Sequence, residues 1–206
     1  YILFLNGESK LDEYFEKLNG LMENDLMQID DPNLLDIDDG DFNSTLRNLG
    51  KNKVLVLCRM SENKPIKNIE EAYLKLHLIS YKFFLPNSLN LENLFDNLVN
   101  VAWTNQGPME INEVQKEILH AKKNNQPFEI KSVDKFPPLT DYIVPPGVRI
   151  ADTRRVRLGA YLSEGTTVMH EGFVNFNAGT LGPAMIEGRI SAGVVVGKNS
   201  DLGGGC

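Results

Sequence analysis

The chain has 206 residues, 42% of them hydrophobic, and a formal net charge of −7. This length and apolar content allow one large domain or two small ones, each with a core. No apolar run approaches the ~18 residues that a membrane span needs, so we expect no membrane partner. A chain this acidic is also not expected to bind nucleic acid, because the phosphates would repel it.

Residues 1–100 have the pattern of a mixed α/β N-terminal domain. Apolar side chains return at helical spacing in three segments, and two short runs rich in aliphatic residues are typical of strands. Asn68 is the expected cap of the second helix, because Glu71 follows at its third position. The expected strands are 1–6 and 53–60, and the expected helices are 10–24, 68–79 and 91–100.

The two cysteines, Cys58 and Cys206, are too few and too far apart for a disulfide framework. This usage favours a reducing compartment, and we expect a cytoplasmic location.

Residues 101–144 are predicted to form a connector with one helix, from Asn112 to Lys123. Proline pairs follow at 137–138 and 145–146. Proline has no amide hydrogen to donate to a sheet, so these pairs belong at the entry to a strand array and not inside it. We therefore place the last domain boundary near Pro145 and assign residues 145–206 to a third unit.

An aliphatic or threonine side chain returns at every sixth residue of this last unit. A strict period of six fits neither a helix nor an ordinary strand, but it is typical of a parallel β-helix, in which each short strand points one side chain inward. The spacing then slips to four before it resumes, which suggests a bulged corner or a small inserted loop. The inward positions are Ile150, Val156, Leu162, Val168, Val174, Thr180 and Ile186, then Ile190, Val196 and Leu202.

The chain starts at Tyr1 inside an apolar run and stops at Cys206 within a coil. A β-helix normally ends in a cap. We therefore expect the sequence to be a fragment of a longer protein, with only the first coils of an incomplete β-helix.

The run Met169–Gly172 offers two candidate catalytic side chains. With Val168 and Val174 inward, strand alternation places His170 toward the interior or a corner and Glu171 on the outer wall. A carboxylate can take a proton from an attacking amine, or accept an acyl group as a mixed anhydride. A glutamate in a strand is also commonly a surface residue without a role, so the residues alone leave this open.

The segment Glu187–Ser191 lies where the register slips, and main-chain amides are expected to be released from the ladder there. Gly188, Arg189 and Ser191 would then bind a carboxylate or part of a CoA chain. A plain corner with a paired Arg189 is the competing interpretation. The roles of two further groups are equally undecided. The asparagines either form a structural ladder or belong to a site (Asn175, Asn177). The arginines either bind a dicarboxylate or join subunits (Arg149, Arg154, Arg155, Arg157).

The residues from 144 to 191 closely resemble those of the tetrahydrodipicolinate N-succinyltransferase family, in the form found in actinobacteria and epsilonproteobacteria. The matching runs are Val144–Ile150, Arg155–Ala160, Gly165–Thr180 and Glu187–Ser191. The resemblance implies a left-handed β-helix, a homotrimer and succinyl transfer from succinyl-CoA to the amino group of opened tetrahydrodipicolinate, in lysine and diaminopimelate synthesis. It also implies that Glu171 is the catalytic glutamate, and that Phe173, Gly188, Arg189 and Ser191 bind substrate or succinyl-CoA.

No tightly bound cofactor is expected, since succinyl-CoA is a co-substrate. The resemblance allows a magnesium ion on the trimer axis, whose ligands do not map onto this segment. A zinc site built from three histidines is not expected, because only His170 lies in the repeat. Two alternatives stay open: another hexapeptide acyltransferase that uses acetyl-CoA with His170 as base, and a non-catalytic assembly subunit. We expect the fragment alone to be inactive, because it lacks the later coils that hold most CoA contacts in the family.

Overall fold

The structure is a computed structural model, and it describes residues 25–29 and 55–205. The chain divides into two compact units, 1–63 and 64–206. The boundaries predicted near residues 100 and 145 both fall inside the second unit and stay predictions. The strand predicted at 1–6, the helix predicted at 10–24 and Cys206 lie outside the described residues.

In the first unit, the described residues form one antiparallel strand pair. Strand β1 (Leu26–Ile29) runs against β2 (Leu55–Cys58), with Leu26 opposite Cys58. The position of β2 confirms the strand predicted at 53–60. The Arg59 guanidinium donates to the Asp25 carboxylate next to this pair, at 3.2 Å.

The second unit begins with two helices, α3 (Ile69–Ser80) and α4 (Leu94–Asn97). Helix α3 starts as predicted: the Asn68 side chain accepts a hydrogen bond from the Glu71 amide at 2.8 Å, which satisfies one of the helix's unpaired donors. Helix α4 is shorter than the predicted 91–100, because the backbone becomes extended at Leu98 and leads into a strand.

Residues 101–134, predicted as a connector with a helix, contain a small antiparallel sheet as well. Strands β3 (Val101–Thr104), β4 (Gly107–Met109) and β5 (Ile130–Asp134) pair in the order β4-β3-β5. Helix α5 (Ile111–Lys123) confirms the predicted helix and contacts β3. The Trp103 indole N–H donates to the carbonyl of Asp134 at 3.0 Å, which ties the central strand to β5.

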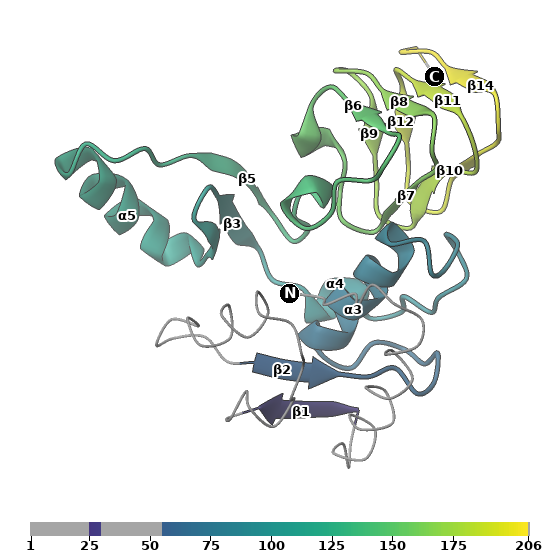
Figure 1. The fold of residues 1–206 in the computed structure, drawn as a ribbon. Coiled ribbons are helices and arrows are strands. Elements are labelled where there is room, and N and C mark those ends of the chain that lie inside the picture. Colours follow the sequence, from purple (N-terminus) through teal and green to yellow (C-terminus); the bar gives the residue numbers. More distant parts are fainter. Residues whose placement is uncertain (1–24, 30–54, 206) are drawn as a thin grey trace, which may run out of the picture. The chain divides into compact units, whose positions relative to one another are not determined.

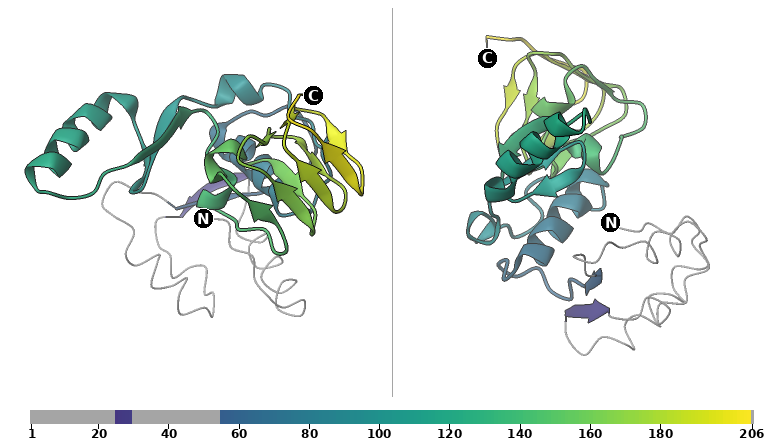
Figure 2. Two further views of the ribbon diagram at one scale, coloured as in Figure 1. Left: turned by 90° about the horizontal axis from the view of Figure 1, so that it is seen from above. Right: turned by 90° about the vertical axis from the view of Figure 1, so that its left-hand side faces the viewer.

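A parallel β-helix follows, and its coils stack strand on strand (Figures 1 and 2). Short helical turns η2 (Leu139–Asp141) and η3 (Thr153–Arg155) lie at its start. The β-helix is left-handed, as predicted. Its strands are β6 (Arg149–Ile150), β7 (Ala160–Leu162), β8 (Thr166–Val168), β9 (Phe173–Val174), β10 (Ala178–Thr180), β11 (Ala184–Ile186), β12 (Arg189–Ile190), β13 (Val195–Val196) and β14 (Ser200–Leu202).

All strand pairs of the β-helix are parallel and form three walls: β6-β8-β11-β14, β7-β10-β13 and β9-β12. Val168 pairs with Ile186 one coil later, a step of 18 residues. Across the register slip the step falls to 16, because Ile186 pairs with Leu202. The slip is therefore a corner shortened by two residues, and the predicted bulge or inserted loop is wrong.

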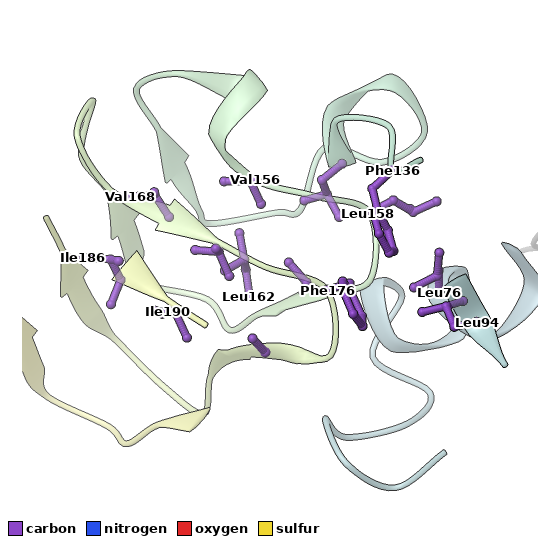
Figure 3. Packing of buried hydrophobic residues seen from close by; sticks show 14 of the residues in the cluster. Leu76, Leu94, Phe136, Val156, Leu158, Leu162, Val168, Phe176, Ile186 and Ile190 are labelled. Carbon is purple, nitrogen blue, oxygen red and sulfur yellow. The ribbon is translucent and has the colours of Figure 1, made fainter. Parts of the chain in front are cut away.

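The predicted inward side chains form the core of the coils. From Val156 to Ile190 every one of them is at most 1% exposed, while Ile150, Val196 and Leu202 are partly buried against the same cluster. Leu76 of α3 and Leu94 of α4 belong to this cluster and lie beside Phe176 (Figure 3). Helices α3 and α4 thus share one hydrophobic core with the β-helix.

Among the described residues, no helix has the length and apolar character needed to cross a bilayer.

Candidate functional site

The predicted substrate-binding residues gather on the outer face of strands β9 and β12. Phe173 pairs with Arg189, and Val174 with Ile190. Because Val174 and Ile190 point inward, alternation turns the residues on either side of them outward. We call this surface the β9–β12 face; its outward residues are Arg155, Phe173 and Arg189 in one row, and Arg157, Asn175 and Ser191 in the next.

Glu171 lies on the corner that leads into this face, between β8 and β9. We call residues Met169–Gly172 the 169–172 corner. Its first amide, that of Met169, donates to the carbonyl of Ile186, and the Gly172 amide donates back to the carbonyl of Met169 at 2.9 Å. Gly172 is buried, and a Cβ there would collide with the carbonyl of Ile186. The corner is thus held against the next coil by its backbone.

Both candidate catalytic side chains point out of this corner. The side chain of Glu171 is 73% exposed and that of His170 is 71% exposed, with 3.7 Å between His170 Nε2 and Glu171 Oε1. The outer-wall position of Glu171 agrees with the prediction. For His170 the prediction left the interior or a corner open. The side chain lies on the corner and points outward, because alternation holds only within a strand and the chain turns at residues 169–172.

The first two amides of the segment at the register slip are not free. The Glu187 and Gly188 amides both donate to the carbonyl of Leu202, at 2.9 Å each, so the release predicted for them does not occur. A Cβ on Gly188 would run into the carbonyl of Gly203, which explains the glycine in this shortened corner. Gly188 therefore serves the stacking of coils in this structure, and its predicted role in binding rests on the resemblance alone.

Glu187 is a second exposed carboxylate at this corner, one coil further on. The Phe173 amide donates to the carbonyl of Gly188 at 3.1 Å, which sets the 187–188 segment directly beside the 169–172 corner. The sequence analysis treated Glu187 only as a member of a segment. The sequence feature that could have identified Glu187 is its spacing of 16 residues from Glu171, which equals the step between Val174 and Ile190.

Three of the four arginines at the start of the β-helix are held by groups of the same chain. Arg154 pairs with Asp152, and its hydrogen bonds lower the pKa of that carboxyl group. Arg155 donates to two main-chain carbonyls of the 169–172 corner. Neither a substrate nor a neighbouring subunit is needed to explain these contacts.

Arg157 is the third, and it joins β5 to the β9–β12 face. It donates to Asp134 Oδ2 at 2.6 Å and to Asn175 Oδ1 at 3.1 Å. Its guanidinium carbon also lies over the rings of Phe136, at 5.0 Å, and Phe173, at 5.6 Å. Arg157 thereby fixes one edge of Phe173 and commits Asn175 to a structural bond.

The side chain of Arg189 makes no hydrogen bond or ion pair with any residue in the described part of the chain, and Arg189 is exposed. It stands beside Phe173, which is half-buried, and one row from Ser191. The predicted set Phe173, Arg189 and Ser191 is therefore brought together next to Glu171, with a cation, an aromatic surface and a hydroxyl available to a ligand.

The other histidines and asparagines have structural contacts. His77 is 5% exposed, and burial lowers its pKa to about 4. His120 lies on exposed α5, with Nδ1 3.4 Å from Glu117. Asn177 exchanges hydrogen bonds with Asn87, at 2.7 and 3.0 Å. These contacts give His77 a packing role and leave His120 on the surface, and they agree with the structural alternative for Asn177.

Neither a metal-binding cluster among the described residues nor the cavity beside α5 coincides with these side chains. No group of three or more His, Cys, Asp or Glu side chains in residues 25–29 and 55–205 is arranged to hold a metal ion. A cavity of about 280 Å³ lies between α5 and the segment that enters β5, lined by Ile118, Ala121, Lys122, Gln126, Phe128 and Ile130. No residue of the β9–β12 face lines this cavity.

Comparison with known proteins gives concordant results. Residues 98–137 match a family model described as the middle region of tetrahydrodipicolinate N-succinyltransferase. Proteins named 2,3,4,5-tetrahydropyridine-2,6-dicarboxylate N-succinyltransferase are similar to this chain: that of Pseudomonas putida is 59% identical over 154 residues, and that of Vibrio cholerae 52% identical over 155. Each match covers 75% of this chain and 45% of the relative. The chain thus spans about half the length of the curated relatives it matches.

A relative from Salinispora tropica with the same name is 54% identical over 148 residues, covering 72% of this chain and 46% of its own. Among solved structures, a putative 2,3,4,5-tetrahydropyridine-2-carboxylate N-succinyltransferase from Campylobacter jejuni superposes with a TM-score of 0.78 at 31% identity. That match covers 98% of this chain and 59% of the solved one.

Proposed function

Because this chain belongs to the tetrahydrodipicolinate N-succinyltransferase family, we propose that the protein transfers a succinyl group from succinyl-CoA to the amino group of opened tetrahydrodipicolinate. The observation that carries the proposal is the identity of 52 to 60% with curated relatives of that name over about three quarters of the chain. Lysine and diaminopimelate synthesis is the pathway in which such a product is used.

Glu171 is the residue to which we assign the chemistry. In one route its carboxylate takes a proton from the nitrogen as the nitrogen attacks the thioester carbon, the C–N bond forms and the C–S bond breaks. In the other, the carboxylate attacks the thioester first and expels the CoA thiolate. The amine then attacks the mixed anhydride, the C–N bond forms, the C–O bond breaks, and the released carboxylate takes the proton from the nitrogen. An exposed glutamate on a corner beside open surface can reach substrate in either route.

The β9–β12 face suits a ligand with carboxylate groups. Arg189 offers a guanidinium that no described side chain occupies, and guanidinium groups bind carboxylates in a bidentate manner. Phe173 supplies apolar contact for the methylene carbons of a succinyl or pimelate chain, and Ser191 supplies a hydroxyl. We assign these three residues to substrate binding.

Homotrimer assembly and a cytoplasmic location are part of the same proposal. Exposed aliphatic side chains on the outside of the coils support assembly with further copies, namely Leu181, Met185, Val194 and Val195. A magnesium ion on the trimer axis stays a prediction, and no step proposed here runs through it.

The test compares glutamine variants of three glutamates in the full-length protein, with CoA thiol release as the readout. Glu171→Gln should reduce succinyl-CoA turnover at least about 100-fold, within the range for removing an acid-base group. Glu164→Gln changes an exposed glutamate on a different corner and should leave turnover within about twofold.

Glu187→Gln and His170→Gln separate the rival assignments at the same corner. Loss of turnover in Glu187→Gln with full turnover in Glu171→Gln would move the catalytic role one coil along. Loss confined to His170→Gln, together with preference for acetyl-CoA, would replace the proposal by the histidine-dependent acetyltransferase. No turnover by the unaltered full-length protein with either donor would favour the non-catalytic assembly subunit.

A further inference from the structure

Arg155 makes an unusual pair of contacts with the 169–172 corner. Its Nη2 donates to the carbonyl of Glu171 at 2.8 Å, and its Nε donates to the carbonyl of Gly172 at 3.0 Å. The two donors of one planar guanidinium thus meet two consecutive main-chain oxygens. Arg155 belongs to η3, at the corresponding corner one coil earlier, so its side chain bridges two coils.

These contacts fix the backbone at the residue whose side chain is the candidate catalyst. Three amides in or next to the corner are already paired: Met169 with the next coil, Gly172 within the corner and Phe173 with the next coil again. Its carbonyls at 171 and 172 point the other way, toward Arg155. The corner is therefore clamped from both sides, and the clamp on the Arg155 side is a single side chain.

Arginine is suited to this task and lysine is not. The guanidinium stays charged at any physiological pH and presents its N–H groups in a rigid plane, so two fixed acceptors can be held at once. An ammonium group is a compact charge on a flexible stem and cannot reproduce the planar pair. Since Nε and Nη2 both point at main-chain oxygens, this edge of the Arg155 guanidinium is occupied and does not offer its pair of donors to a substrate carboxylate.

We propose that Arg155 is a positioning residue: it holds the 169–172 corner so that the Glu171 carboxylate faces the reacting groups. This inference rests on the proposed function, which assigns the chemistry to Glu171. Displacing a reacting group by about 1 Å can reduce a rate on the order of 100-fold. Loosening the corner should therefore lower kcat, while Arg189, Phe173 and Ser191 still bind substrate and keep KM unchanged.

The neighbouring Arg154 provides a matched control. It lies on the same short helical turn and carries the same charge, but its guanidinium pairs with exposed Asp152 and does not contact the corner. Arg154→Ala removes one positive charge from the same place in the fold. Any effect of net charge on succinyl-CoA binding should appear equally in both variants.

The experiment measures steady-state kinetics and amide hydrogen exchange in the full-length protein for Arg155→Lys, Arg155→Ala and Arg154→Ala. We expect kcat to fall about 10-fold or more in Arg155→Ala and by less in Arg155→Lys, with KM for both substrates within about twofold. Exchange at the amides of Met169, Gly172 and Phe173 should quicken in both Arg155 variants and not in Arg154→Ala. Arg155→Lys keeps the aliphatic stem, so it serves if the alanine variant does not fold.

Three results would overturn the inference, and they are distinguishable. Wild-type kcat in both Arg155 variants, with Glu171→Gln inactive, would refute the positioning role and leave the proposed function intact. Full activity of Glu171→Gln would refute the assignment of Glu171 and the role of Arg155 together. A rise in KM with unchanged kcat would assign Arg155 to substrate binding.

Discussion

Replacing Thr180 by valine tests the inward frame of the β-helix at a polar position. Thr180 is fully buried, and its Oγ1 accepts a hydrogen bond from the Ser163 amide at 3.1 Å and lies 2.6 Å from Thr166 Oγ1. Valine has nearly the same shape but no hydroxyl. The substitution therefore changes the hydrogen bonding of the core with little change in its packing.

The expected loss of stability follows from what remains unpaired. Without the Thr180 hydroxyl, the Ser163 amide has no acceptor, and the Thr166 hydroxyl keeps only a contact to the carbonyl of Gly182 at 3.3 Å. Leaving a buried donor unsatisfied costs about 1–3 kcal/mol. We expect Thr180→Val to lower the free energy of unfolding by about 2 kcal/mol.

Urea unfolding at fixed protein concentration, followed by circular dichroism, measures this change. Thr167→Val is the control, because Thr167 lies on the same strand as Thr166 but points outward and is half-exposed; it should change stability by less than about 0.5 kcal/mol. The double variant Thr166→Val with Thr180→Val should be non-additive, since the two hydroxyls are partners. Equal effects of Thr180→Val and Thr167→Val would refute the reasoning.

Three further predictions follow from single contacts. Gly179→Ala should prevent folding or cost more than about 3 kcal/mol in urea unfolding, because its Cβ would collide with the backbone of the preceding coil. Arg157→Ala should cost about 1–2 kcal/mol in the same assay, since it breaks the bond to Asp134, and Arg157→Lys should recover part of it. Burial lowers the pKa of His77 to about 4, below the ordinary value of 6.5, so the unfolded chain binds the proton more tightly. Stability should therefore be complete above pH 6.5 and fall by about 2–3 kcal/mol on acidification to pH 4, a slope that His77→Gln should flatten in unfolding curves taken across that range.

The period of six predicted the architecture of the C-terminal unit almost residue by residue. It placed Val156, Val168 and Ile186 inside because a β-helix repeats one local geometry, and one inward position per strand is enough to set the register. The cap at Asn68 was equally readable, since it depends on two residues three positions apart. Both are local signals.

What the sequence did not predict depends on corners and on long-range pairing. The alternation rule left His170 either inward or at a corner, and it could not decide between them because it does not apply where the chain turns between β8 and β9. The sheet β4-β3-β5 was missed because its strands are three to five residues long and include Gly107 and Pro108, which are rare within strands.

The candidate site was predicted in part for the same reasons. Phe173 and Arg189 lie side by side, and Ser191 follows two residues later, because the parallel register places equivalent residues of successive coils next to each other. Their role in binding stays a prediction. The partners of Arg155 and Arg157 could not be predicted, since a long side chain reaches residues 16 to 23 positions away and no local pattern records the choice. Only coordinates could separate these two structural arginines from Arg189.

The central claim is most directly tested by the product that the full-length protein forms. Tetrahydrodipicolinate would be incubated with equal concentrations of succinyl-CoA and acetyl-CoA, and the acylated product identified by mass spectrometry. The account predicts the N-succinylated product, formed with release of one CoA thiol per molecule and lost in Glu171→Gln. An N-acetylated product, or no acylated product from either donor, would contradict it.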